Sequence, residues 1–237
     1  HTLSAEQVLA LYNNRTDLIV NQETTTGEVW NATITPNDGT IDGTTKWSNA
    51  LTILANAQPI QGTPILNSTY GTSSSNENLT VYNVSTADGD TDDVKNIINW
   101  YMNDTSITVL NMPFEADGTD NASDYSGLGN NGTPTGGVTW NATAGYDGKG
   151  AFEFDGDDDY ISLGDIIDIG ANNDLTISTW IKTDSAAGEI IAKTSGASPL
   201  YRFQISSGKL LIRVNDGVFN LNTISTSLLN DSLWHHT

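Results

Sequence analysis

Acidic and amide side chains are the residues of this chain best suited to chemistry, and the chemistry they suit is the binding of a hard cation. Asp124 and Asn130 lie in the motif D-Y-S-G-L-G-N-N-G, and Asp155 and Asp157 lie in the run F-D-G-D-D-D-Y. Ca²⁺ prefers oxygen ligands from Asp, Asn and backbone carbonyl groups. The sequence therefore predicts that Asp124 and Asn130, with a carboxylate from Asp155, Asp157 or Asp158, bind Ca²⁺. A solvated turn without a metal is the alternative.

A second acidic run begins with the ligand spacing of an EF-hand calcium loop. Asp88, Asp90 and Asp92 stand at its first, third and fifth positions. The sixth position of such a loop requires Gly and the twelfth requires Glu, but this chain has Asp93 and Asn99 there. We interpret the run as a solvated turn, with cation binding as the alternative.

Residues for enzymatic catalysis are scarce. The His residues are His1, His235 and His236, so a Ser-His-Asp triad or a His acid–base pair is poorly supplied. Glycoside hydrolysis needs two carboxylates that flank the scissile bond, but Glu153 and Asp155 lead into a Gly-Asp turn and form no E-x-D-x-x-E strand. The scattered glycines form no phosphate-binding loop. We expect no enzyme; a glycan-cleaving enzyme that depends on Glu153 is the alternative.

The composition favours an all-β chain that does not bind nucleic acid. Hydrophobic residues are 37% and charged residues 16% of 237, which suits short strands and many turns. Nine basic against 29 acidic residues give a net charge of -20, so nucleic acid is not an expected partner. There is no Cys for a disulfide, and no apolar run approaches the ~18 residues that span a bilayer. No signal peptide is visible at His1, as in a mature or excised fragment.

N-glycosylation sequons of the form Asn-x-Ser/Thr are about twice as frequent as chance predicts. Ten occur, against roughly five expected for this composition. They predict a heavily glycosylated surface protein, since glycans are bulky and solubilising. A chance origin is the alternative, because a chain rich in Asn and Thr inflates such counts. The sequon asparagines are Asn14, Asn31, Asn67, Asn78, Asn83, Asn103, Asn121, Asn131, Asn141 and Asn230.

One short helix is predicted at the start of the chain. Ser4 is a favourable N-cap, and Gln7 three residues later completes a capping box. An apolar stripe at helical spacing follows, so the helix must pack on another element. The stripe consists of Ala5, Val8, Leu9 and Tyr12.

Short strands with period-two alternation are predicted downstream. Trp30 and Ile34 are expected to share a buried face, and Leu79 and Val81 lie on one side of another strand. A strand is also expected over 94–102, with a helix over the same residues as the alternative. Five aromatic residues are expected in a β-sandwich core, with stacking on sugars as the alternative. They are Trp140, Tyr146, Tyr160, Trp180 and Tyr201.

The last third of the chain resembles the laminin-G-like family, whose members adopt the concanavalin A-like jelly-roll fold. The resemblance rests on L-N-M-P-F-E-A-D, D-Y-S-G-L-G-N-N-G, Y-D-G-K-G-A-F-E-F-D-G-D-D-D-Y-I, L-T-I-S-T-W-I-K and W-H-H, in this order over 110–237. In that family more strands follow W-H-H, and a short helix announced by L-S-x-E closes the module; residues 3–12 look like that helix. The resemblance implies that His235 and His236 are structural and Trp234 is core. Relatives often bind calcium, which agrees with the prediction for Asp124.

The residues between resemble two halves of an Ig-like, PKD-type domain. The string G-E-V-W-N-A-T-I-T-P-N-D-G-T-I-D-G is similar to the closing half, and N-W-Y-M-N-D is similar to the opening half, with Trp100 as its core tryptophan. Ala32 stands where immunoglobulin domains have a Cys, so the disulfide of that family is ruled out. A single irregular β domain over 17–109 is the alternative. The predicted division is a closing laminin-G-like helix (1–16), the second Ig-like half (17–55), a linker (56–63), the first Ig-like half (64–109) and a jelly roll incomplete at its C-terminal end (110–237).

The predicted fold class is therefore all-β, a concanavalin A-like jelly-roll sandwich plus an Ig-like β-sandwich, with one short N-terminal helix. The expected function is that of a non-enzymatic, N-glycosylated, extracellular structural or adhesive repeat protein, as in archaeal or bacterial surface repeat proteins. It would form a cell-surface filament, sheath or stalk with copies of itself, with incomplete modules completed by neighbouring strands. The alternative is a calcium-dependent carbohydrate-binding module with glycans as partners.

Overall fold

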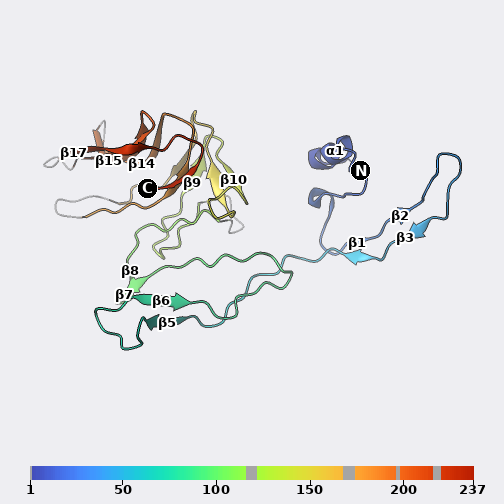
Figure 1. The fold of residues 1–237 in the computed structure, drawn as a ribbon, viewed down its shortest axis with the longest axis horizontal. Helices are drawn as coiled ribbons and strands as arrows, with labels where there is room; N and C mark the ends of the chain where they lie inside the picture. The colour runs from blue at the N-terminus through green and yellow to red at the C-terminus, as the bar shows by residue number, and fades with distance from the viewer. Residues whose placement is uncertain (1, 116–121, 168–173, 196–197, 216–219) are drawn as a thin grey trace. The chain divides into compact units, whose positions relative to one another are not determined.

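The chain folds mainly into short antiparallel strands with one short α-helix, in agreement with the all-β prediction (Figure 1). The computed structural model describes residues 2–115, 122–167, 174–195, 198–215 and 220–237. The contacts divide the chain into two compact units, 1–96 and 97–237. This boundary lies inside the predicted segment 64–109, and the five-part division of the sequence stays a prediction.

The helix α1 (Ala5–Tyr12) begins as the sequence predicts, because the Ser4 side chain accepts a 3.2 Å hydrogen bond from the N–H of Gln7. The other half of the predicted capping box is wrong. The N–H of Ser4 donates to Glu23 Oε1 at 2.5 Å, at the end of the 3₁₀ turn η1 (Asn21–Glu23). Because Glu23 accepts from the N–H of Ser4, the side chain of Gln7 can bond to other residues.

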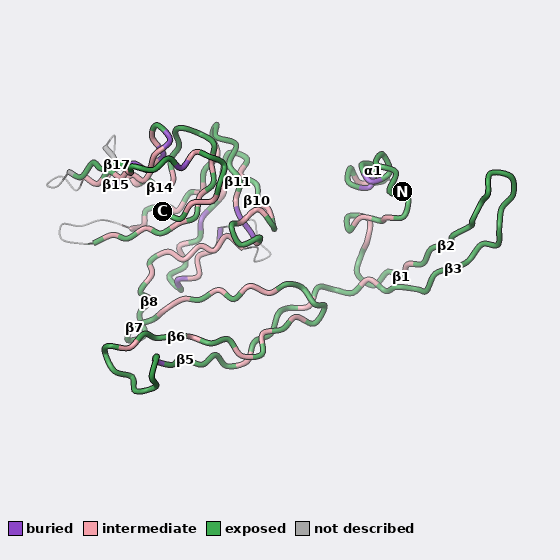
Figure 2. The backbone as a smooth tube through the Cα atoms, in the orientation of Figure 1, coloured by how far each residue is buried: buried purple, intermediate pink, exposed green. Residues whose placement is uncertain are grey.

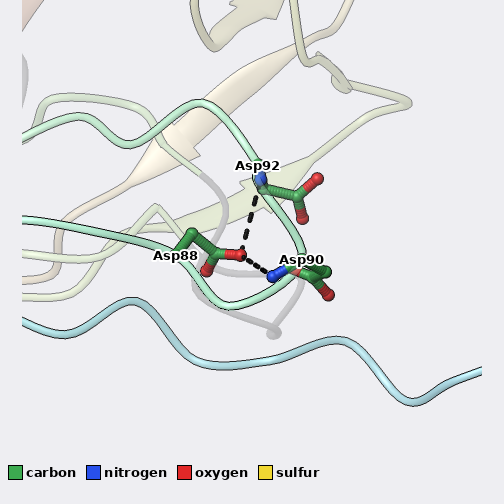
Figure 3. Close-up of side chains that lie close together, drawn as sticks. All are labelled: Asp88, Asp90 and Asp92. Carbon is green, nitrogen blue, oxygen red and sulfur yellow. Dashed lines mark hydrogen bonds between the residues drawn. The ribbon is translucent and has the colours of Figure 1, made fainter.

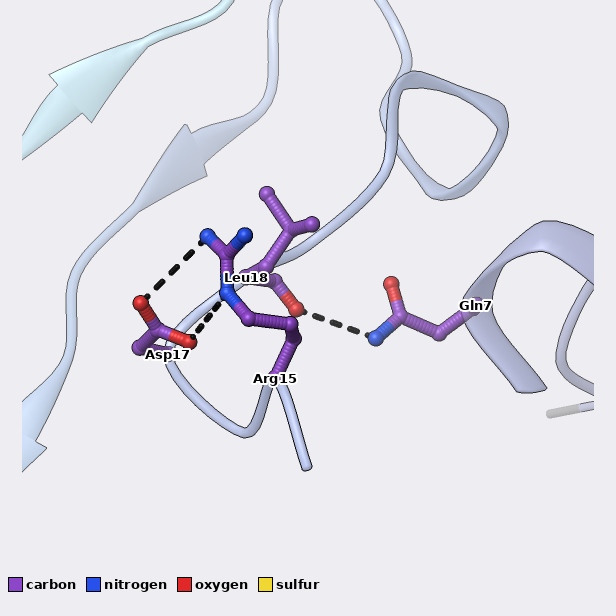
Figure 4. Close-up of polar contacts among 4 residues, drawn as sticks. All are labelled: Gln7, Arg15, Asp17 and Leu18. Carbon is purple, nitrogen blue, oxygen red and sulfur yellow. Dashed lines mark hydrogen bonds and ion pairs between the residues drawn. The ribbon is translucent and has the colours of Figure 1, made fainter. Parts of the chain in front are cut away.

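Gln7 is buried and fastens α1 to the segment that follows it. Its Nε2 donates to the carbonyl oxygen of Leu18 at 3.0 Å (Figure 4). Its Oε1 accepts from the N–H of Val20 at 2.9 Å. Next to it Arg15 and Asp17 form an exposed ion pair at 2.9 Å. Gln7 and Ala10 are the buried residues of the helix, so its polar side faces the chain. The predicted apolar stripe instead faces solvent, and Tyr12 is 85% exposed.

The described strands of the first unit form separate two-stranded antiparallel hairpins. The predicted buried face of Trp30 and Ile34 is wrong for Ile34, which is 74% exposed, whereas Trp30 is half-buried. No third strand pairs with any of these hairpins within the described residues, so the outer edges of each hairpin have no partner strand there. The hairpins are β1 (Val29–Trp30) with β4 (Leu51–Thr52), β2 (Thr33–Ile34) with β3 (Lys46–Trp47), and β5 (Ile65–Ser68) with β6 (Leu79–Tyr82).

The second unit opens with a tight hairpin, β7 (Tyr101–Met102) and β8 (Thr105–Ser106). Asn103 and Asp104 connect the strands with φ of 50° and 63°, the left-handed pair of a type I′ turn. The predicted strand over 94–102 is therefore wrong for residues 94–100, which are neither strand nor helix. Apolar residues alternate in this segment, but no strand pairs with it among the described residues. The alternation alone therefore does not produce a strand there.

The remaining strands of the second unit build its larger sheet and three two-stranded antiparallel ladders. The sheet contains β14 (Ala187–Ser195), β15 (Ser198–Ser206), β16 (Lys209–Asn215) and β17 (Asn220–Leu228), in this antiparallel order. Ser207 and Gly208, with φ of 52° and 75°, form the two-residue turn between β15 and β16. The ladders are β9 (Thr133–Thr135) with β12 (Tyr160–Ser162), β10 (Thr139–Asn141) with β11 (Ala151–Glu153), and β13 (Trp180–Lys182) with β18 (Trp234–His236).

Burial is concentrated in the second unit (Figure 2). Tyr201 and Ile205 of β15 lie on one face of the sheet and are 3% and 4% exposed. In the first unit Ala10 is the one apolar residue that is buried among those described. Fully burying a large apolar side chain stabilises a fold by about 1.5 to 3 kcal/mol, so the first unit lacks most of this contribution. None of the described helices has the length and apolar character needed to cross a membrane.

Candidate functional site

Asp124 is the centre of a hydrogen-bonded loop. Its Oδ1 accepts from the N–H groups of Asn111 and Ser126, both at 2.9 Å. Its Oδ2 accepts from the Ser126 hydroxyl at 2.6 Å and from the N–H of Asn130 at 3.0 Å. Burial raises the pKa of Asp124, but the hydrogen bonds, that of Ser126 foremost, outweigh burial and lower it. The carboxylate is thus held in its ionised form.

The same loop is anchored through Ser126, which is fully buried. The carbonyl oxygen of Ser126 accepts from Asn99 Nδ2 at 2.9 Å and from the Tyr101 hydroxyl at 3.4 Å. The predicted ligands Asp124 and Asn130 do come together, but Asn130 contributes its backbone N–H, and its Nδ2 donates elsewhere. A cation would have to displace N–H and O–H donors that point at both oxygens. Calcium binding by Asp124 and Asn130 stays a prediction, whereas a structural anchor fits the observed contacts.

A second acidic group forms at the turn between β11 and β12. Ligand oxygens of Asp155, Asp158 and Asp159 lie within 4.8 Å of one another. The N–H of Asp155 donates to Asp159 Oδ2 at 2.9 Å, and the N–H of Asp157 donates to Asp155 Oδ1 at 2.8 Å. Asp159 Oδ1 is buried and has no hydrogen-bond partner among the described residues. Such an oxygen is suited to a cation, because an unpaired buried acceptor is costly.

The residues that cluster at this turn differ from the calcium ligands predicted from the sequence. Asp155 belongs to the cluster as predicted, whereas the side chain of Asp157 is outside it. Asp159 was missed, although the run of three consecutive Asp residues was the signal that could have revealed it. Asp124 belongs to neither of the acidic clusters found among the described residues.

The loop from Asp88 to Asp92 forms the other acidic cluster (Figure 3). Asp88 Oδ1 accepts from the N–H of Asp90 at 3.0 Å and from that of Asp92 at 3.4 Å. Asp90 Oδ2 accepts from the N–H of Ala57 at 2.9 Å, which joins the loop to the segment predicted as a linker. A hydrogen bond with Asp88, followed by that from Ala57, lowers the pKa of Asp90. These contacts describe a hydrogen-bonded turn, and the interpretation as a solvated turn, with cation binding as the alternative, stays a prediction.

The two described histidines make separate contacts. His235 Nε2 lies 2.8 Å from Asp231 Oδ1, and this hydrogen bond is the main reason why the pKa of Asp231 is lowered. His236 Nε2 lies 2.8 Å from the hydroxyl of Ser178. Consecutive residues of a strand point to opposite faces, so the Ser–His and His–Asp pairs do not combine into a catalytic triad.

Aromatic side chains form a partly exposed stack. The rings of Tyr146 and Trp180 are parallel within 8° with centroids 4.0 Å apart, and His236 lies tilted beside Trp180 at 5.1 Å. Tyr146 is 52% and Trp180 is 41% exposed. The expectation of a core position is confirmed for Tyr201 and wrong for the other four aromatics. The exposed four are Trp140, Tyr146, Tyr160 and Trp180.

Most sequon asparagines lie where a glycan has room. Asn141 and Asn230 are half-buried, and Asn141 Nδ2 donates to Glu153 Oε1 at 3.0 Å. Asn121 lies outside the described residues. The exposed asparagines are Asn14, Asn31, Asn67, Asn78, Asn83, Asn103 and Asn131.

Comparison with known families gives one finding. Residues 155–237 match the family model of the concanavalin A-like lectin/glucanases superfamily. This part of the chain, which holds the four-stranded sheet, is therefore similar to the family that the sequence motifs indicated. Residues 110–154 of the predicted jelly roll and the Ig-like halves rest on the sequence motifs. No curated protein and no solved structure matches the chain.

Proposed function

We propose that the chain is a non-enzymatic, N-glycosylated building block of an extracellular surface structure, in which it associates with further copies of itself. Modules of β-sandwich type would join head to tail into a filament, sheath or stalk. The match to a lectin-type domain agrees with an extracellular role, since such domains are typically extracellular and without catalytic activity.

The observation that carries this proposal is the exposure of large apolar side chains on the hairpins of the first unit. Ile34 is 74%, Trp47 is 71% and Leu54 is 76% exposed. Trp47 pairs with Thr33 and Ile34 pairs with Lys46, so each face of this ladder exposes one large apolar side chain. Such a side chain gains free energy when a partner covers it. A two-stranded hairpin is at best marginally stable in water. Packing against another chain would supply the missing contacts.

The helix α1 adds a second surface of the same kind. Gln7 holds its polar side against the chain, so Val8, Leu9 and Tyr12 remain 54%, 58% and 85% exposed. An amphipathic helix with an uncovered apolar stripe is a common recognition element that binds in apolar grooves. Association through α1 and through the hairpins would bury both.

Sedimentation velocity on the secreted, glycosylated chain tests the proposal. We expect assemblies that grow with protein concentration, and filaments or sheets in electron micrographs. Because the net charge is -20, higher ionic strength should strengthen association by screening repulsion. Trp47→Ser should weaken association, whereas Thr35→Ser, a change at an exposed polar residue nearby, should not. A monomer at every concentration and ionic strength would contradict the proposal.

A carbohydrate-binding module is the second candidate, favoured by the exposed stack of Tyr146 on Trp180. Aromatic faces of this kind can pack against sugar rings, and calcium at the Asp155 turn would be its predicted cofactor. A glycan array probed with and without calcium tests this function. Trp180→Ala should then abolish binding, and Tyr160→Ala serves as the matched aromatic control. An absence of glycan binding under both conditions would exclude it.

A further inference from the structure

Basic residues are concentrated on the four-stranded sheet, although the chain as a whole is strongly acidic. Four of the nine basic residues lie within residues 190–215, and that range contains no acidic residue. Lys193 is neutralised within the chain, because its Nζ lies 2.8 Å from Asp165 Oδ1. The remaining three cations are Arg202, Lys209 and Arg213.

These three cations share one face of the sheet. Arg202 lies directly opposite Arg213 in the ladder of β15 with β16, and Lys209 lies two alternate positions from Arg213 on β16. Directly opposed residues share a face, and every second residue of a strand returns to it. We call the face with Arg202, Lys209 and Arg213 the basic face.

The positive charge of the basic face is only partly balanced within the chain. Like charges in direct opposition across a ladder destabilise it. Glu189 Oε1 lies 3.2 Å from Arg202 Nε and balances one of the two guanidinium groups. Arg213 is exposed and forms no ion pair with any residue that the structure describes. A carboxylate from outside the chain would therefore lower the energy of this face.

The loop from Asp88 to Asp92, which we call the acidic loop, has the opposite imbalance. Carboxylate oxygens of Asp88, Asp90 and Asp92 lie within 4.8 Å of one another. Asp90 and Asp92 are exposed, and none of the three carboxylates pairs with a basic side chain in the described part of the chain. A guanidinium group suits such carboxylates, because its planar N–H groups can donate two parallel hydrogen bonds to one carboxylate.

A second copy of the chain can bring these two surfaces together. The acidic loop belongs to the first unit and the basic face to the second. A contact between two different surfaces is heterologous, so each copy keeps one surface of each kind for a further copy. Such contacts continue into a filament when the rotation between copies does not close a ring.

We infer that the basic face of one copy, through Arg202 and Arg213, binds the acidic loop of a second copy, through Asp90 and Asp92. The inference rests on the proposed self-association and names its contact. Complementary charges of this kind select the partner surface and its orientation. Salt screens the repulsion between whole acidic copies more than it screens pairs in direct contact, so the contact is compatible with stronger association at higher ionic strength.

Reversing one charge of the basic face tests the first half of the contact. We expect Arg213→Glu to weaken association of the full glycosylated chain about tenfold in sedimentation velocity, and Arg213→Gln to weaken it less. Lys182→Glu makes the same charge change at an exposed strand residue outside the basic face and should have little effect. Equal weakening by Arg213→Glu and Lys182→Glu would show an effect of net charge alone and would overturn the inference.

Neutralising the acidic loop tests the second half. Asp90→Asn/Asp92→Asn makes the chain less negative, so a general loss of repulsion would strengthen association. We expect the opposite, an association weakened about tenfold, because the loop loses the charges that bind the basic face. Asp157→Asn/Asp158→Asn removes two exposed carboxylates from another turn and is the control. Association that is unchanged or stronger in the loop variant contradicts the contact.

Mixing the two kinds of variant shows whether the contact joins separate copies. Arg213→Glu retains an intact acidic loop, and Asp90→Asn/Asp92→Asn retains an intact basic face. We expect the mixture to associate more strongly than either variant alone at the same total concentration. A mixture that behaves as the average of its two components would mean that these charges act within one chain, and the inference would be wrong. Circular dichroism of each variant verifies that its fold is intact.

Failure of the inference is distinguishable from failure of the proposed function. If the native chain stays monomeric under all conditions, both fail. If the native chain assembles and Arg213→Glu assembles equally well, the proposed function stands and the contact lies elsewhere. If Arg213→Glu associates like the native chain but loses binding to the polyanion heparin, the basic face takes an acidic polysaccharide and not a second copy.

Discussion

The hydroxyl of Ser126 donates a 2.6 Å hydrogen bond to Oδ2 of Asp124, and the backbone N–H of the same Ser126 donates to Oδ1 at 2.9 Å. The two residues thus close a ring in which one carboxylate organises its own loop. The contact of this carboxylate with Asn111 ties the loop to a segment 13 residues earlier. The contribution of the Asp124 carboxylate to the stability of the fold can be measured without any ligand.

Asp124→Asn is expected to destabilise the second unit by about 1 to 2 kcal/mol, because an amide nitrogen would face N–H or O–H donors where an oxygen now accepts. Thermal unfolding followed by circular dichroism measures this, with Asp104→Asn at an exposed turn as the control. Since the pKa of Asp124 is lowered, its contribution is complete above the ordinary value of 3.8 and is lost as pH falls below it. An unchanged stability in calcium-free buffer would contradict the anchor role.

Gln7→Ala should detach α1 from the segment that follows it. The change leaves the carbonyl oxygen of Leu18 and the N–H of Val20 without their partner, at an expected cost of about 1 to 3 kcal/mol in local stability. Amide hydrogen exchange within α1 measures the loss. Glu6→Ala, on an exposed position of the same helix, is the control. Equal protection in both variants would mean that Gln7 does not hold the helix.

Glu77 should titrate far below an ordinary glutamate. Hydrogen bonds from the Ser68 and Thr72 hydroxyls, and then from the N–H groups of Tyr70 and Ser74, lower its pKa from 4.5 to about 2. The loop between β5 and β6 therefore keeps this stabilisation above pH 4.5 and loses it as pH falls through 2. NMR shifts of the Tyr70 and Ser74 amides should show a midpoint near 2 that is absent in Glu77→Gln. A midpoint near 4.5 would contradict the contacts.

Calcium should raise the unfolding midpoint if the turn between β11 and β12 binds it. Stabilisation would reach about 2.7 kcal/mol when free calcium is 100 times the dissociation constant. Asp159→Asn should abolish the effect, because Asp159 Oδ1 is the buried oxygen without a partner. Asp157→Asn should preserve it, because that side chain lies outside the cluster. An equal response of both variants would place the ion elsewhere.

Local structure could be predicted from the sequence where it depends on residues that are close together in the chain. Ser4 caps α1, and the alternation of Leu79 and Val81 corresponds to β6, because capping and pleating depend on neighbouring residues. The apolar residues of 94–100 alternate equally well, yet they have no partner strand and stay irregular. Strand pairing depends on residues that are far apart in the sequence, so apolar alternation within one segment does not predict it.

The candidate site was harder to predict for the same reason. The motif around Asp124 revealed that this residue matters, but only the folded loop shows that donors saturate both of its oxygens. Burial was also misjudged at Trp180 and Tyr160, because the sequence shows that a side chain is apolar but does not show whether another layer covers it.

The short strands of the first unit determine the conditions under which this unit would unfold. The ladders of β1 with β4 and of β2 with β3 contain two residue pairs each, and none of their described apolar residues is buried. If neighbouring copies supply the missing contacts, folding of this unit obeys mass action, and its folded fraction rises with protein concentration. Dilution alone would then unfold these hairpins at a temperature at which the concentrated protein is stable, and proteases would cleave them first in the dispersed chain.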